Sequence, residues 1–305
     1  MEIGIKGGGD MPAENNTAVI IEGDTLVHYE GSDREFVIPD GVRVIGERAF
    51  ADNMKLASIT VPPSVVVIEN EAFAECRALN EIHLPNTVDK IGDRAFMRCQ
   101  SLISIELPMS VSDFGEGVFA YCTRLLRVEL PVNIKELKSL TFEMCTCLEE
   151  IEVPDRIKLI GEGAFRGCTA LSKVALSIKL EKIGKEAFKD CVSLTVIQLP
   201  HSLGFMGYDS QGAFEGCENL EMITIGDDTY FDPDCGVFVN CPKLLDIRYS
   251  HLNEDDVIRV FPAYLKKLRD RQIEWQAHKK CTYCGGDFSG VIKKVCKNCG
   301  KQKAY

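Results

Sequence analysis

The chain has 305 residues, a formal net charge of −11 and 45% hydrophobic residues. This length is sufficient for a large buried core, and no apolar run approaches the ~20 residues that a membrane-spanning helix requires. The first residues lack the basic segment followed by an apolar segment that marks a signal peptide. We therefore expect a cytoplasmic protein, or a surface protein if a targeting segment precedes this sequence.

Residues 1–35 are expected to form an N-terminal tail and a capping hairpin. Two segments rich in apolar residues, 18–21 and 25–29, are expected to have strand alternation on either side of Gly23-Asp24. An Asp or Asn next to a Gly between two alternating segments is typical of a tight hairpin turn. Such a hairpin would cover the open end of the segment that follows it.

Residues 36–250 repeat with a period of 23. A proline recurs at this spacing, at Pro39, Pro62, Pro85, Pro108, Pro131 and Pro154, and again two periods later at Pro200. Nine phenylalanines mark nine units: Phe50, Phe73, Phe96, Phe119, Phe142, Phe165, Phe188, Phe214 and Phe238. A period of this size predicts a solenoid in which each unit stacks on its neighbours.

A cysteine follows most of these phenylalanines by three residues. The column comprises Cys76, Cys99, Cys122, Cys145, Cys168, Cys191, Cys217 and Cys241, with Asn53 in the first unit. We interpret these residues as small buried hydrophobes, because pairing neighbours as disulfides would break a uniform stack. A column of reduced thiols fits a reducing compartment.

Each unit contains three short segments. The end of the pattern L-x-x-I-x-L-P has period two and predicts a strand with one buried face, closed by proline. The segment V-x-x-I-G predicts a second extended piece, whose glycine (Gly46, Gly92, Gly161 or Gly184) would allow a turn at positive φ. The stretch A-F-x-x-C-x-x-L, with apolar residues three apart, predicts a helical or 3₁₀ turn.

These columns resemble the BspA-type leucine-rich repeat, a bacterial subfamily with the pattern L-x-x-I-x-L-P-x-x-V-x-x-I-G-x-x-A-F-x-x-C. The resemblance covers roughly residues 36–249. It implies a right-handed, curved leucine-rich repeat solenoid of short parallel strands. It also implies a family often found on secreted or surface proteins that adhere to host or matrix proteins.

The exposed side of the longer strands is the candidate protein-binding face. Positions eight and ten after each phenylalanine should point away from the core, because they flank a buried residue. The candidates in the middle units are Glu81, His83, Glu106, Arg127, Glu129, Glu150 and Glu152. The excess of carboxylates favours a basic peptide or protein as partner. The alternative is that these positions are polar only for solubility.

The eighth unit departs from the period. Phe188 and Phe214 are 26 residues apart rather than 23, and the extra residues lie near Tyr208. The next unit gains one residue and contains Tyr230. Insertions in repeat arrays map to loops, which are either binding sites or tolerated bulges. Tyr208 and Tyr230 are therefore added to the protein-binding candidates.

Residues 251–280 are expected to form a helical cap and linker after the last repeat. Val257, Phe261, Leu265 and Leu268 have helical spacing. Pro262 would break or restart the helix, because it removes a backbone donor.

Residues 281–305 contain two C-x-x-C pairs, formed by Cys281, Cys284, Cys296 and Cys299. This arrangement resembles a zinc ribbon, in which four thiolates hold Zn²⁺ tetrahedrally and leave no open coordination position. We expect a structural ion, with a small hairpin in the eleven-residue spacer. Paired disulfides or a redox C-x-x-C motif are the alternatives.

The two parts of the chain carry opposite charge. Residues 1–252 hold 23 basic and 40 acidic side chains, or −17, whereas residues 253–305 hold 12 basic and 6 acidic side chains, or +6. No Walker-type loop or other catalytic constellation is present. The sequence therefore predicts a monomeric, non-enzymatic protein-binding scaffold. The alternatives are a nucleic-acid or ribosome-associated adaptor that acts through the basic end, and a BspA-type adhesion protein.

Overall fold

The computed structural model describes residues 19–226, 229–231, 235–244 and 246–249, and the backbone of two short strands at 288–289 and 295–296. The tail before residue 19 and the expected helical cap at 251–280 lie outside the described residues. So does the cysteine module at 281–305, apart from those two strands.

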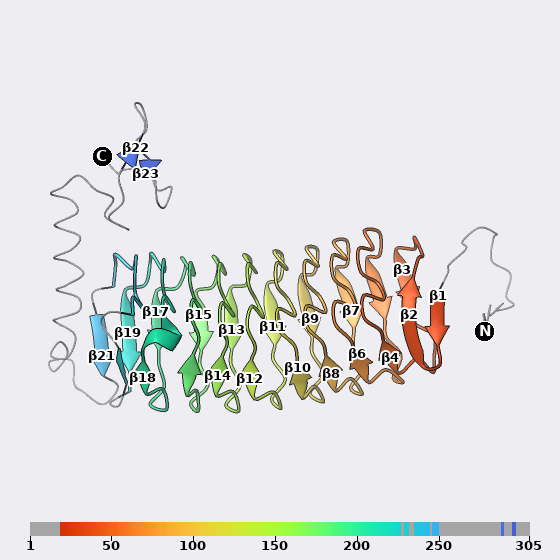
Figure 1. The fold of residues 1–305 in the computed structure, drawn as a ribbon, viewed down its shortest axis with the longest axis horizontal. Helices are drawn as coiled ribbons and strands as arrows, with labels where there is room; N and C mark the ends of the chain where they lie inside the picture. Colours follow the sequence, from red (N-terminus) through yellow and green to blue (C-terminus); the bar gives the residue numbers. More distant parts are fainter. Residues whose placement is uncertain are drawn as a thin grey trace, which may run out of the picture.

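Two columns of short parallel strands run along the molecule (Figure 1). The column of longer strands comprises β3 (Glu35–Val37), β5 (Ser58–Thr60), β7 (Glu81–His83), β9 (Ser104–Glu106), β11 (Arg127–Glu129), β13 (Glu150–Glu152), β15 (Lys173–Ala175), β17 (Val196–Gln198), β19 (Met222–Ile225) and β21 (Asp246–Tyr249). The column of two-residue strands comprises β4 (Val44–Ile45), β6 (Val67–Ile68), β8 (Lys90–Ile91), β10 (Asp113–Phe114), β12 (Glu136–Leu137), β14 (Leu159–Ile160), β16 (Lys182–Ile183), β18 (Phe205–Met206) and β20 (Tyr230–Phe231).

Paired strands within each column come from successive repeats, and their equivalent residues lie opposite one another. In the longer column, Glu129 of β11 lies opposite Glu106 of β9. In the shorter column, Phe114 of β10 lies opposite Ile91 of β8. The sequence prediction of a parallel solenoid of about nine turns is confirmed, because equivalent residues of successive units lie side by side.

The phenylalanine column forms a continuous stack through the core. Neighbouring rings from Phe50 to Phe238 have centroids 5.0 to 5.6 Å apart and lie within 17° of parallel. All nine rings are buried. The stack extends to the N-terminal end, where Tyr29 lies 5.2 Å from Phe50. A single apolar core therefore runs the length of the repeats.

The cysteine column is free of disulfides, and its thiols are also hydrogen-bond donors. Each sulfur donates to the carbonyl of the phenylalanine one unit earlier, at 3.0 to 3.2 Å. In the first unit Asn53 takes this role, because its Nδ2 donates to the Gly31 carbonyl at 2.9 Å. The sequence predicts only apolar packing for this column. The structure adds a hydrogen bond between successive repeat units, which we call rungs.

The expected helical turn around each phenylalanine is wrong. Residues two before and two after it have positive φ in every unit, for example Arg48 (56°) and Asp52 (64°). A residue at positive φ does not belong to a right-handed helix, so two of them four residues apart leave a turn here instead of a helical segment. This turn also directs backbone N–H groups to the next rung, as in Phe50 N to Ala72 O at 2.8 Å. Among the described residues only η1 (Tyr208–Ser210) is helical, and no helix there is long and apolar enough to cross a membrane.

The glycines that end the two-residue strands have a different role from the one predicted. Gly46, Gly92, Gly161 and Gly184 are not in the positive-φ region. Instead they lie against the backbone of the preceding rung. A Cβ built on Gly92 would stand 2.6 Å from the Asn70 nitrogen and 2.7 Å from the Glu69 carbonyl carbon. Close approach between rungs, rather than turning freedom, requires glycine here.

We therefore expect Gly92→Ala to lower the free energy of unfolding by about 1–3 kcal/mol, because backbone atoms must move to admit the methyl group. Urea unfolding followed by circular dichroism measures this change. Gly204→Ala is the matched control, since a Cβ at Gly204 meets no atom within 4 Å. Equal stability of the two variants would contradict the close-approach explanation.

The N-terminal hairpin begins the solenoid. Strands β1 (Val19–Glu22) and β2 (Thr25–Tyr29) pair antiparallel around Gly23-Asp24, where the sequence predicts a hairpin. The inner strand β2 then pairs in parallel with β4, so Leu26 lies opposite Ile45. Tyr29 packs on both Phe36 and Phe50. The hairpin therefore covers the first rung and shields its apolar core from water.

Candidate functional site

The exposed side of the longer strands carries most of the candidate residues. In β7, β9 and β11 the central residue is buried and the two flanking residues are exposed. β13 follows the same pattern, although Glu150 is only half-exposed. The structure therefore brings seven candidates to one face: Glu81, His83, Glu106, Arg127, Glu129, Glu150 and Glu152. We call this surface the strand face.

Part of the charge on the strand face is neutralised locally. Arg127 Nη2 lies 2.6 Å from Glu150 Oε1, and Lys173 Nζ lies 3.8 Å from Glu150 Oε2. Glu150 therefore stands between two cations from the neighbouring strands. At the other end of the face, the imidazole of His83 lies 3.6 Å from the carboxylate of Glu81, a contact that neutralises charge only when the imidazole is protonated. The acidic surface is consequently narrower than the sequence alone indicates.

Three carboxylates of the strand face have no ion-pair partner among the described residues. Glu106, Glu129 and Glu152 occupy the same strand position in three successive rungs, and all are exposed. Glu106 and Glu129 are direct cross-strand neighbours. Like charges opposite one another destabilise a sheet. No cation of the described residues compensates this row, and all three carboxylates are exposed.

Exposed apolar side chains lie at both ends of two of the strands that carry this row, β9 and β11. Ile103 and Leu126 immediately precede β9 and β11, and each is 40% exposed. Met109 and Val132 follow the same strands by three residues and are 58% and 48% exposed. The repeat pattern did not predict an exposed apolar side chain at these four positions. A signal was present, because equivalent positions in neighbouring units hold Asn80, Glu149, Asn86 and Asp155.

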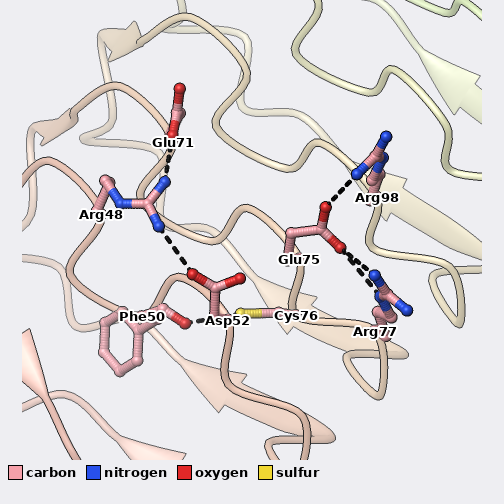
Figure 2. A network of polar contacts seen from close by, with 8 residues as sticks. All are labelled: Arg48, Phe50, Asp52, Glu71, Glu75, Cys76, Arg77 and Arg98. Atoms are coloured by element: carbon pink, nitrogen blue, oxygen red, sulfur yellow. Dashed lines mark hydrogen bonds and ion pairs between the residues drawn. The ribbon is translucent and has the colours of Figure 1, made fainter.

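The turns around the phenylalanines carry a second charged surface, in which the described charges largely satisfy one another (Figure 2). Arg48 bonds Glu71 of the next rung and Asp52 of its own. Glu75 accepts hydrogen bonds from both Arg77 and Arg98. Partial burial alone would raise the pKa of Glu75, but these two guanidinium groups hold it below its ordinary value. Pairing of this kind neutralises the charges around Arg48 and Glu75.

The insertion in the eighth unit lies away from the strand face. Tyr208 begins η1, directly after β18 of the two-residue column, and is 68% exposed. Lys185 Nζ lies 3.9 Å from the centre of its ring, a cation–π contact. Tyr230 belongs to β20, which pairs with β18. The structure therefore groups Tyr208 and Tyr230 with the shorter strands and apart from the acidic row.

The described residues do not include the side chains of the four cysteines that the sequence predicts as metal ligands. Cys281, Cys284 and Cys299 lie outside them, and only the backbone of Cys296 is described. That backbone belongs to an antiparallel pair, in which β22 (Phe288–Ser289) faces β23 (Val295–Cys296). The pair lies within the spacer between the two C-x-x-C motifs. Within the described part of the chain, no cluster of three or more metal-ligating side chains occurs.

Comparison with known proteins identifies the repeats. The profile of the BspA-type leucine-rich repeat region matches residues 27–148 and 136–255. A leucine-rich repeat protein from Bacteroides ovatus is 32% identical, with a TM-score of 0.63, over 70% of this chain and 55% of that one. The present chain thus spans just over half the length of that protein.

A leucine-rich repeat protein from T. pallidum is 30% identical, with a TM-score of 0.54, over 61% of this chain and 91% of that one. No curated protein matches the sequence. The resemblance to known proteins therefore concerns the solenoid and leaves the partner open.

Proposed function

This chain belongs to the BspA-type leucine-rich repeat family, and on that premise we propose that it is a non-enzymatic protein-binding scaffold. Its partner binds the strand face and is basic. The observation that carries this proposal is the row of Glu106, Glu129 and Glu152, which is exposed and without an ion-pair partner among the described residues. Such a row steers and aligns a cationic partner.

Reversing two charges in the row is expected to abolish recovery of the partner. We expect Glu129→Lys combined with Glu152→Lys to lower the recovery of basic proteins in affinity purification from the native cell by at least tenfold. Two charges change sign, which raises the net charge by four units, and like charges then face the partner. Quantitative mass spectrometry of the captured proteins measures the loss.

The matched control combines Glu116→Lys with Glu162→Lys. Both glutamates are exposed and lie in the turns rather than on the strand face, so the net charge changes equally. This variant should retain the partner. Equal recovery by wild type and by the strand-face variant would refute the proposed function.

We also propose that Cys281, Cys284, Cys296 and Cys299 bind a structural Zn²⁺. The support is the spacing of the four thiols and the backbone hairpin of β22 and β23 between the two pairs. Thiolate ligands suit zinc, and a module this small would draw much of its folding free energy from the metal.

Metal analysis of the purified chain should find about one zinc per molecule, as expected for a Cys₄ site. The double substitution Cys296→Ser and Cys299→Ser should remove it, because two of the four ligands are lost. Cys147→Ser is the control, since Cys147 is a free thiol within the solenoid. Zinc retained by the double variant, or absent from the wild type, would eliminate this site.

Three further sequence predictions stay predictions. The nucleic-acid alternative depends on residues 253–305, most of which lie outside the described residues. The cytoplasmic location is supported by the free cysteine column, which suits a reducing compartment. Cell fractionation and light scattering would test the location and the monomeric state.

A further inference from the structure

We propose that the partner segment seated on the strand face is an amphipathic α-helix lying along the solenoid axis. This inference rests on the proposed function and specifies its partner. The occupant comes from another protein and carries Lys or Arg at i, i+4 and i+7, with large apolar residues beside them. Its cations meet Glu106, Glu129 and Glu152.

The spacing of the rungs favours a helix over an extended strand. The rings of Phe96, Phe119 and Phe142 are separated by 5.6 Å at each step, and paired strands lie about 4.8 Å apart. One turn of an α-helix rises about 5.4 Å. Alternate residues of an extended strand advance by about 6.6 Å. A basic stripe on a helix therefore stays aligned with three successive glutamates, whereas the same charges on a strand move out of alignment.

The exposed apolar residues fit the remaining surface of such a helix. Met109 and Val132 follow Glu106 and Glu129 by three residues, so their Cα atoms lie no more than about 10 Å away. A helix with its side chains is about 10–12 Å wide. A helix seated over the acidic row can therefore also contact these apolar side chains. Burial of apolar area would then add to the charge pairing.

Charge complementarity selects a basic rather than an acidic helix. Glu150 is already paired with Arg127 and Lys173, so the cations of the strand face are engaged. Glu106, Glu129 and Glu152 have no such partner among the described residues. A basic stripe would pair with each of them, and an acidic helix would face three carboxylates of its own sign.

The test compares two fluorescein-labelled synthetic peptides of identical composition by anisotropy with the full-length chain. One places Lys and Leu at helical spacing, and the other alternates Lys with Leu. We expect the helical pattern to bind about tenfold more tightly and to gain helical circular dichroism on binding, since it can form all three charge pairs. Equal affinity for both peptides would overturn the helical inference.

Two matched variants test whether the helical peptide binds at the strand face. The triple substitution Glu106→Gln, Glu129→Gln and Glu152→Gln should weaken binding of the helical peptide about tenfold. The control triple Glu47→Gln, Glu116→Gln and Glu162→Gln removes equal charge from exposed turn positions and should change affinity less than about twofold, because it leaves the row intact. Thermal unfolding confirms that both variants fold.

The outcomes separate this inference from the proposed function. If both peptides bind equally and both depend on the three glutamates, the strand face binds basic ligands but does not select a helix. If the triple substitution changes the affinity for neither peptide, both proposals fail.

Carbodiimide joins carboxylates to lysine amines. Cross-links in the peptide-free chain between this row and lysines of residues 253–305 would instead assign the face to the chain's own basic segment and overturn the inference.

Discussion

Raising the pH from 8.5 to 10.5 is expected to unfold the solenoid. Seven thiols of the cysteine column are fully buried: Cys76, Cys99, Cys122, Cys145, Cys168, Cys191 and Cys217. Burial raises the pKa of Cys76 and Cys122 to about 12, and that of Cys145 well above its ordinary value. In the unfolded chain a thiol has a pKa of about 8.5.

The direction of the pH effect follows from proton binding. The folded state keeps these thiols protonated, and the unfolded state releases the protons above pH 8.5. The stabilisation that these protonated thiols provide is therefore fully present below the pKa of the unfolded chain, and it is lost as the pH rises toward 12. Each thiol contributes a loss of about 1.4 kcal/mol per pH unit, so seven together approach ~10 kcal/mol per unit. At that slope, a rise of about one pH unit removes about as much free energy as the usual stability of a domain.

Urea unfolding at a series of pH values measures this slope. Cys145→Ala should reduce this slope by the contribution of one thiol, about 1.4 kcal/mol per pH unit. It should also lower the free energy of unfolding at pH 8. Cys147→Ala serves as the control, because Cys147 is outside the column and only half-buried. Constant stability between pH 8.5 and 10 would show that the column does not hold its protons.

Replacing Phe142 by alanine is expected to lower the free energy of unfolding by about 3–5 kcal/mol, as for other large buried rings. The ring is fully buried and stacks 5.6 Å from Phe119 and 5.4 Å from Phe165. Its loss leaves a cavity in the middle of the stack. Because each unit contacts mainly its neighbours, the cavity also weakens the coupling between the two halves.

Hydrogen exchange would show whether the halves separate. In Phe142→Ala we expect amides of the rungs that contain Phe119 and Phe165 to exchange faster, while the outer rungs keep more of their protection. Phe142→Leu is the conservative control and should cost less, because it fills most of the cavity. A loss below about 1 kcal/mol for Phe142→Ala would contradict a continuous stack.

The sequence was sufficient to predict the repeats because identical positions recur every 23 residues. The buried columns at Phe96, Cys99 and Ile105 and the exposed positions at Glu106 and Glu129 all follow from that period. Strand alternation then determines which side chains reach the strand face. Stacking of rungs in register places them in rows.

Features that depend on the neighbouring rung were not predictable in this way. The turn at Arg48 has the apolar spacing of a helix, but its backbone bonds to the next unit instead. Gly92 is needed because another backbone passes close to it, which a single unit does not reveal. By contrast, the pairing of Glu150 with Arg127 and Lys173 follows from the period, because the three residues occupy the same position in successive units.

Carbodiimide cross-linking of the full-length chain to its partner, captured from the native cell, tests the proposed function most directly. The reaction joins carboxylates to lysine amines in contact, and mass spectrometry locates the joined residues. We expect cross-links from Glu106, Glu129 and Glu152 to lysines of the partner. Cross-links confined to the turn glutamates, such as Glu47 and Glu116, would show that the partner binds elsewhere.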